Sequence, residues 1–312
     1  MAGIRMHPKN AVHFITNRCE QEQFLLLPSK TTNSIVLSWL VKALFFVNYG
    51  IEIYAFICLS NHIHLLLRDI EGKLAQFMCY FEANVARAMN RELGRRGKFW
   101  AREYDDVIVD GEDEFLDRYA YVVCNAVKAG LVDKAEDWTG LNSLSNALSG
   151  EPYRVEVLNK TKLHNATRRG QKVDRRKFIE TFEFSLTIPP MWEDLSVKDR
   201  ASKIRELVKS GEKEYRQRRE GKPALGMRKI ATQKPPDRPK NPAFRPRIKV
   251  FCFDKERRKE LLNAYRLHVG AYREIWDGFV KAAAKGKRPA IEWPAWSYPP
   301  SSWTPIGYAK AA

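Results

Sequence analysis

Two runs of strand-forming residues, separated by a short turn, constrain the fold of this chain more than any other feature. Residues 51–58 read IEIYAFIC and residues 62–68 read HIHLLLR, so both runs are dominated by apolar side chains. Ser60 and Asn61 stand between them and favour a turn. The two runs therefore predict an antiparallel β-hairpin, which any fold of this chain has to contain.

Helical and strand patterns alternate through the first 150 residues. The expected helices cover 31–47, 74–93 and 112–129, and the expected strands besides the hairpin cover 12–17 and 104–109. Helices that alternate with antiparallel strands in this order are typical of an α+β domain. We therefore expect a ferredoxin-like antiparallel sheet with helices on one face.

The charge of the chain is concentrated in its second half. The 312 residues carry a formal net charge of +17, yet residues 1–150 have a net charge of −2 and residues 151–312 one of +19. Such an asymmetry indicates a polyanionic partner, with nucleic acid the first candidate, whereas the alternative is a basic solvated tail.

The same composition change divides the chain into three predicted segments. Residues 1–150 form the compact domain, and residues 151–247, rich in Arg, Lys and Pro, are expected to be a basic linker or a DNA-contacting arm. Residues 248–312 are expected to be helical and then Trp/Pro-rich. Together the last two segments form a basic, mostly helical or irregular C-terminal extension, with helices expected near 196–220 and 254–284.

Several protein classes are excluded by what the sequence lacks. The longest apolar stretch, near 35–47, is interrupted by Ser38 and Lys42 and is too short for a membrane span. No apolar signal core stands at the N-terminus, and the five cysteines form no CxxC pair. We therefore expect a cytoplasmic, nucleoid-associated protein without disulfides.

Two of the six histidines lie in one tripeptide, His62-Ile63-His64. Residues two apart on a strand point to the same side, so both imidazoles are expected to project together from the hairpin. Paired imidazoles can bind a divalent metal. HxH is a weak motif by itself, and two unrelated surface histidines are the alternative interpretation.

The helical pattern at 112–129 offers further groups for such a site. At 100° per residue, Tyr119 falls on the apolar face with its valines, whereas Tyr121, Asn125 and Lys128 fall on the opposite face. Tyr121 and Asn125 are four residues apart, where helical side chains meet. If this face covers the histidines, two imidazoles, one amide and one phenol form a single site.

Such a set of groups suits phosphodiester transesterification. A metal would polarise a scissile phosphate, and attack by a tyrosine would leave a phosphotyrosine and a free 3′ hydroxyl. The chain has no phosphate-binding Gly-rich loop, and zinc hydrolysis is less apt because the H-E-x-x-H motif is absent.

Four segments of the chain, taken together and in order, resemble one known family. They read VHFITNR at 12–18, SNHIHLLL at 60–67, GKFWAREY at 97–104 and YVVCNAVKAGLV at 121–132. In this order they resemble the REP-associated tyrosine transposases, within the single-tyrosine HUH transposase superfamily. The likeness covers roughly residues 8–145. It departs from the family pattern at Ser60 and Ala126, where proline is common.

The resemblance implies a specific activity and specific residues. It implies a ferredoxin-like HUH domain that binds Mg²⁺ or Mn²⁺ and nicks and rejoins single-stranded DNA at hairpin (REP-like) elements through a 5′-phosphotyrosine. His62 and His64 match the family's metal-binding histidines, Tyr121 its nucleophile, and Asn125 the asparagine that completes the metal site. The alternatives are a non-cleaving hairpin-binding regulator and a nuclease that uses metal-bound water.

Basic and aromatic side chains are expected to hold the DNA. The basic candidates for nucleic-acid binding are Arg95, Arg96, Lys98, Arg102 and Lys128. Three tryptophans near the C-terminus either stack on unpaired bases or, as we favour, pack the tail: Trp293, Trp296 and Trp303. A monomer or a homodimer is compatible with a single tyrosine nucleophile.

Overall fold

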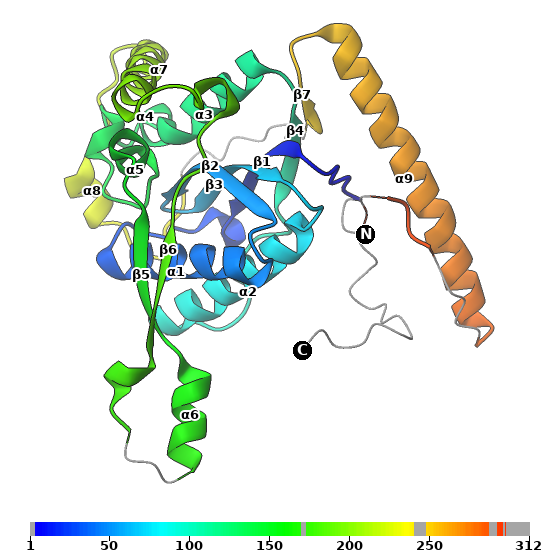
Figure 1. Cartoon of the computed structure of the whole chain (residues 1–312). Coiled ribbons are helices and arrows are strands. Elements are labelled where there is room, and N and C mark those ends of the chain that lie inside the picture. Colours follow the sequence, from blue (N-terminus) through cyan, green and yellow to red (C-terminus); the bar gives the residue numbers. More distant parts are fainter. Residues whose placement is uncertain (1–3, 170–172, 240–247, 287–291, 296, 298–312) are drawn as a thin grey trace.

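A five-stranded sheet forms the centre of the molecule (Figure 1). The computed structural model describes residues 4–169, 173–239, 248–286, 292–295 and 297. The strands are β1 (Ala11–Arg18), β2 (Ile51–Leu59), β3 (His62–Asp69), β4 (Asp105–Val109) and β7 (Val250–Phe251). Their order in the sheet is β2-β3-β1-β4-β7, and only the short β7 pairs in parallel, with β4.

The predicted hairpin lies at one edge of this sheet. β2 and β3 pair antiparallel from Leu59 opposite His62 to Ile51 opposite Asp69. β1 pairs with the other side of β3, so that Thr16 lies opposite His64 and Arg18 opposite His62. The tripeptide that carries both histidines therefore starts an interior strand, flanked by β2 and β1.

The helices cover both faces of the sheet, so the expectation of helices on one face is wrong. α1 (Lys30–Phe46) and α2 (Leu74–Glu92) pack on one face, and α3 (Glu112–Val123) packs against β2 and β3 on the other. The reason is visible in β2, where eight of nine residues are buried and apolar side chains point both ways. A strand buried on both faces needs a layer on each side.

The third helix is also shorter than its pattern predicts. α3 ends at Val123, and α4 (Asn125–Lys128) follows after Cys124, whose φ of −96° and ψ of 9° interrupt the helix. Cys124 is fully buried and its Sγ lies 3.7 Å from the Val208 carbonyl oxygen. The interruption thus coincides with a tertiary contact.

Much of the region beyond residue 150 is folded. It continues from α5 (Leu144–Ser149) with β5 (Tyr153–Leu158), α6 (Lys160–Arg168), β6 (Ile179–Phe184), α7 (Val197–Gln217), α8 (Met227–Ala231) and α9 (Lys255–Ala284). α7 contributes Ile204, Val208 and Tyr215 to the core beneath α3. The helices expected near 196–220 and 254–284 therefore form, as α7 and α9. The three-segment division stays a prediction, although its middle segment includes packed elements.

The chain is thus an α+β protein with a mixed sheet, two helical layers and a second, two-stranded sheet of β5 and β6. None of the helices in the described ranges has the length and apolarity that crossing a membrane requires.

Candidate functional site

His62 and His64 lie side by side on the sheet face that α3 covers. Their ring centroids are 4.8 Å apart, as the two-residue spacing on β3 predicts. The Asn61 Oδ1 lies 2.6 Å from Nδ1 of His62, and the Thr16 Oγ1 lies 2.8 Å from Nδ1 of His64. Each ring is therefore held at its Nδ1 by a neighbouring polar side chain.

Tyr121 and Asn125 join the two histidines from the helical layer. The Tyr121 ring lies 5.4 Å from the His64 ring and 5.4 Å from the Phe14 ring, edge-on to both. The Asn125 side chain is buried, hydrogen-bonds the His62 ring and donates weakly, at 3.4 Å, to the Tyr121 carbonyl. The polar face of the third helical pattern thus meets the His62/His64 strand, and four residues predicted from separate segments form one cluster.

Both imidazoles are held in the neutral state. Desolvation lowers the pKa of His62 to about 3, the charge of Arg18 lowers it as well, and the hydrogen bond with Asn125 opposes them. Burial lowers the pKa of His64 well below its ordinary value, with contributions from His62 and Lys128. A neutral imidazole keeps the nitrogen lone pair that a metal requires.

Cationic side chains surround the Tyr121 ring. The Lys128 ammonium lies 4.1 Å from the centroid of that ring, and the Arg118 guanidinium lies 4.9 Å from it. Arg118 also stacks on Phe251 of β7, at 4.0 Å. Arg118 is also ion-paired with Asp117, so the site combines two neutral imidazoles with the charge of Lys128 and a partly compensated guanidinium around a phenol. Net positive charge beside a phenol attracts a phosphate group.

The donor set fits a divalent metal only in part. In the described residues, no group of three or more His, Cys, Asp or Glu side chains is arranged to hold a metal ion. Two imidazoles and the Asn125 amide are the protein donors available, so further ligands would have to come from water or from a substrate phosphate. Imidazole nitrogen and amide oxygen suit Mn²⁺ or a similar ion better than Mg²⁺, which prefers oxygen ligands alone.

The predicted basic loop lies next to the site but does not enter it. The backbone N–H of Ala101 donates to the Arg18 carbonyl, so the loop follows the end of β1 beside His62. Arg96 and Lys98 are exposed. The side chain of Arg95 contacts Gln23 and Asn90, and that of Arg102 pairs with Asp105 at 2.7 Å. Of the five predicted DNA-binding cations, only Lys128 contacts a site residue.

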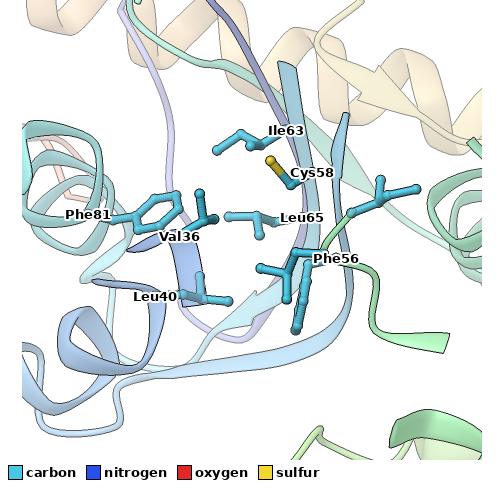
Figure 2. A pocket seen from close by; sticks show the side chains of 9 residues that line it. Val36, Leu40, Phe56, Cys58, Ile63, Leu65 and Phe81 are labelled. Atoms are coloured by element: carbon cyan, nitrogen blue, oxygen red, sulfur yellow. The ribbon is translucent and has the colours of Figure 1, made fainter. Parts of the chain in front are cut away.

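The other sequence candidates have simpler places. Tyr119 is buried 5.7 Å from Trp192 and belongs to the core. Trp293 lies 4.9 Å from Tyr272 of α9, while Trp296 and Trp303 fall outside the described residues. A small apolar cavity lies on the α1/α2 side of the sheet (Figure 2). Ile63 lines it, whereas His62 and His64 point to the opposite face of β3. The cavity lining also includes Val36, Leu40, Phe56, Leu65 and Phe81, which suit packing rather than catalysis.

Sequence reasoning did not assign several residues that contact the site, among them Phe14, whose ring stacks on that of His64 with centroids 5.1 Å apart. Thr16 and Asn61 orient the imidazoles, and Arg118 lies three residues before Tyr121, a helical spacing that could have identified it. Phe251 gave no local signal, because it is 130 residues away from Tyr121 in the sequence and reaches Arg118 only through the fold.

Comparison with known proteins gives a low-level likeness to solved structures. No family model and no curated protein matches the chain. The chain is similar to a solved structure described as a REP-associated tyrosine transposase bound to a REP hairpin, with 17% sequence identity and a TM-score of 0.40. The likeness covers 48% of this chain and 86% of that one.

Proposed function

We propose that the chain is a metal-dependent, single-tyrosine transposase that nicks and rejoins single-stranded DNA at hairpin elements. The observation that carries the proposal is the cluster of His62, His64, Tyr121 and Asn125, in which a phenol lies against two neutral imidazoles. A protein that only binds hairpins has no need for this set of groups. The resemblance of the four sequence segments to REP-associated tyrosine transposases agrees with it.

Tyr121 is the nucleophile in this proposal. Its hydroxyl oxygen attacks the phosphorus of a DNA phosphodiester, the bond from phosphorus to the 3′ oxygen breaks, and the phenol proton passes to solvent. The released 3′ oxygen takes up a proton and leaves as a hydroxyl, while the 5′ end of the DNA stays bound as a phosphotyrosine. Attack by a 3′ hydroxyl on that phosphotyrosine reverses the step and joins two ends.

The other residues bind and position the phosphate. His62, His64 and Asn125 would hold Mn²⁺ or Mg²⁺, which when bound polarises the scissile phosphate and screens its charge. Arg118 and Lys128 supply positive charge beside the Tyr121 ring, where the negative phosphodiester has to lie. Asn61 and Thr16 keep the imidazoles in fixed orientations, as residues behind metal ligands commonly do.

The test uses end-labelled single-stranded DNA hairpins, the purified chain and Mn²⁺ or Mg²⁺, analysed on a denaturing gel. We expect a metal-dependent covalent protein–DNA adduct that Tyr121→Phe abolishes while hairpin binding stays within a few-fold. Tyr119→Phe is the matched control, because it removes a hydroxyl from a core residue two positions away and should keep the adduct.

Each of the other outcomes of this experiment would indicate a different activity or a different nucleophile. Cleavage without an adduct would identify a nuclease that uses metal-bound water, with Tyr121 only contacting the substrate. Tight hairpin binding without cleavage would identify a regulator that retains the fold. An adduct that survives Tyr121→Phe would show that another residue is the nucleophile.

A further inference from the structure

A two-stranded ribbon with a helix at its end projects from the domain, and we name its described residues, 153–169 and 173–184, the arm. β5 and β6 pair antiparallel over six residues each, from Tyr153 opposite Phe184 to Leu158 opposite Ile179. α6 follows β5 at the far end of the ribbon. Figure 1 shows the ribbon running away from the central sheet, with α6 at the outer end of the ribbon.

The base of the arm is fixed to the domain. Tyr153, Val155 and Phe184 are buried in the core on the α1 side of the sheet. Phe182 packs edge-on against Phe45 of α1, with ring centroids 4.7 Å apart. Because the base is part of the core, the ribbon holds α6 at a defined place rather than on a flexible tether.

The outer end of the arm is strongly basic. Residues 160–177 include eight Lys and Arg but one acidic residue, Asp174. Two of these cations are paired: Lys162 with Glu180 at 2.8 Å and Arg176 with Asp174 at 3.2 Å. Four exposed cations make no ion pair with any other described residue: Arg168, Arg169, Arg175 and Lys177.

The composition of this outer end favours phosphates over bases. No Phe, Tyr or Trp occurs in residues 160–177. Proteins that hold unpaired nucleic acid combine basic grooves with aromatic side chains on which bases stack, whereas phosphate contacts need cations alone. Four unpaired cations on a rigid support therefore fit the regularly spaced phosphates of a duplex.

We propose that the arm binds the phosphate backbone of double-stranded DNA, namely the paired stem of the hairpin whose single strand the candidate site cuts. This inference rests on the proposed function for its substrate. It assigns a distinct task to a part of the chain beyond the segments that carry the family resemblance. The arm adds affinity for the stem without reading its sequence, because phosphate contacts carry no direct sequence information.

The experiment compares two variants of the full chain with equal charge changes. The arm variant replaces four cations with glutamine: R168Q, R169Q, R175Q and K177Q. The control variant does the same on the exposed side of α7: K198Q, R205Q, K209Q and K213Q. Binding to a DNA hairpin and to a stemless oligonucleotide of equal length is measured between 50 and 200 mM salt, and circular dichroism checks that both variants are folded.

We expect the arm variant to lower the slope of log affinity against log salt for the hairpin by about 3 to 4, since each phosphate contact contributes about 0.9. Its slope for the stemless oligonucleotide should stay unchanged, and the control variant should resemble the wild type on both. An unchanged hairpin slope in the arm variant overturns the proposal. An equal fall on the stemless oligonucleotide, or an equal fall in the control variant, overturns it as well.

Failure of the arm proposal is distinct from failure of the proposed function. A wild-type chain that forms the adduct, but whose arm variant keeps the full hairpin slope, loses only the arm proposal. A wild-type chain that binds no hairpin loses both, and the arm would then be tested against an acidic protein surface, the other partner that exposed cations attract.

Discussion

Asn61→Ala is the change that most directly tests how the candidate site holds a metal. The Asn61 Oδ1 accepts a hydrogen bond from Nδ1 of His62 over 2.6 Å, which leaves the other ring nitrogen as the one with a lone pair. Without that acceptor, the neutral His62 ring can exchange protons between its two nitrogens and rotate. We therefore expect weaker metal binding with an unchanged nucleophile.

The magnitude follows from the position of Asn61 behind a proposed ligand. Loss of the residue that orients a metal-binding histidine typically costs 10- to 100-fold in metal affinity, or about 1.4 to 2.8 kcal/mol. Asn61 also donates to the Glu22 carbonyl at 3.1 Å, so part of the effect comes from the loop it holds. Asn61→Asp keeps the acceptor for His62 and should recover much of the loss.

The assay is the rate of adduct formation as a function of Mn²⁺ concentration. We expect the half-saturating concentration to rise 10- to 100-fold in Asn61→Ala, while the rate at saturating Mn²⁺ stays close to that of the wild type. Ser60→Ala is the matched control in the same turn, because the buried Ser60 hydroxyl makes no hydrogen bond within the described residues. An unchanged half-saturating concentration, or an equal rise in Ser60→Ala, would refute the role of Asn61.

Three further predictions concern stability. Burial raises the pKa of Glu82 to about 8, although a hydrogen bond from Asn17 lowers it in part. The folded state therefore keeps a proton on Glu82 that the unfolded state releases near pH 4.5. Stability should therefore fall between about pH 5 and pH 8, by up to about 1.4 kcal/mol per pH unit, and urea titrations of Glu82→Gln should lack this fall. Desolvation raises the pKa of Asp106, but the hydrogen bonds and charges of His13 and His7 outweigh it and hold that pKa below its ordinary value. Asp106→Asn should therefore lower the free energy of unfolding in urea at pH 7 by about 3 kcal/mol. The stabilisation by ionised Asp106 is fully present above about pH 4 and decreases as the pH falls below that value. The free energies of unfolding of the wild type and of Asp106→Asn should therefore converge on acidification. Ile204→Ala should lower the free energy of unfolding by about 2 to 5 kcal/mol, because Ile204 is buried beneath α3. Lys203 is exposed, so Lys203→Ala should change that free energy by less than about 0.5 kcal/mol.

The hairpin and the histidine pair could be predicted because each depends on local spacing alone. Side chains alternate along β3, so His62 and His64 had to share a face wherever the strand lay. The same applies to Tyr121 and Asn125, which stay four residues apart although the helix is interrupted at Cys124. What spacing could not provide was the contact between the two pairs, because it depends on which face of the sheet α3 covers.

The helix near 196–220 was predicted, but its packing into the core was not, because the apolar signal of its segment is diluted by charge. α7 carries seven Lys and Arg among its 21 residues, and its segment as a whole resembles a linker. Yet Ala201, Ile204, Val208 and Tyr215 recur at helical intervals and form a narrow apolar stripe. Averaging over the segment concealed that stripe, which a residue-by-residue reading of the helix would have revealed.

The position of α7 determines how the C-terminal region can be tested. Tyr119, Val122 and Val123 of α3 belong to one core with Trp192, Ile204 and Val208, which lie beyond residue 150. A Cβ added at Gly211 would lie 3.4 Å from Cys124 Sγ, so α7 also fits closely against the interruption between α3 and α4, next to Asn125. Deleting residues 151–312 would expose this core and remove the support of α3 and α4, which carry Tyr121 and Asn125. A truncated chain that failed to bind DNA would therefore report lost support for the site as much as lost phosphate contacts, whereas substitutions at the exposed end of the arm leave that support in place.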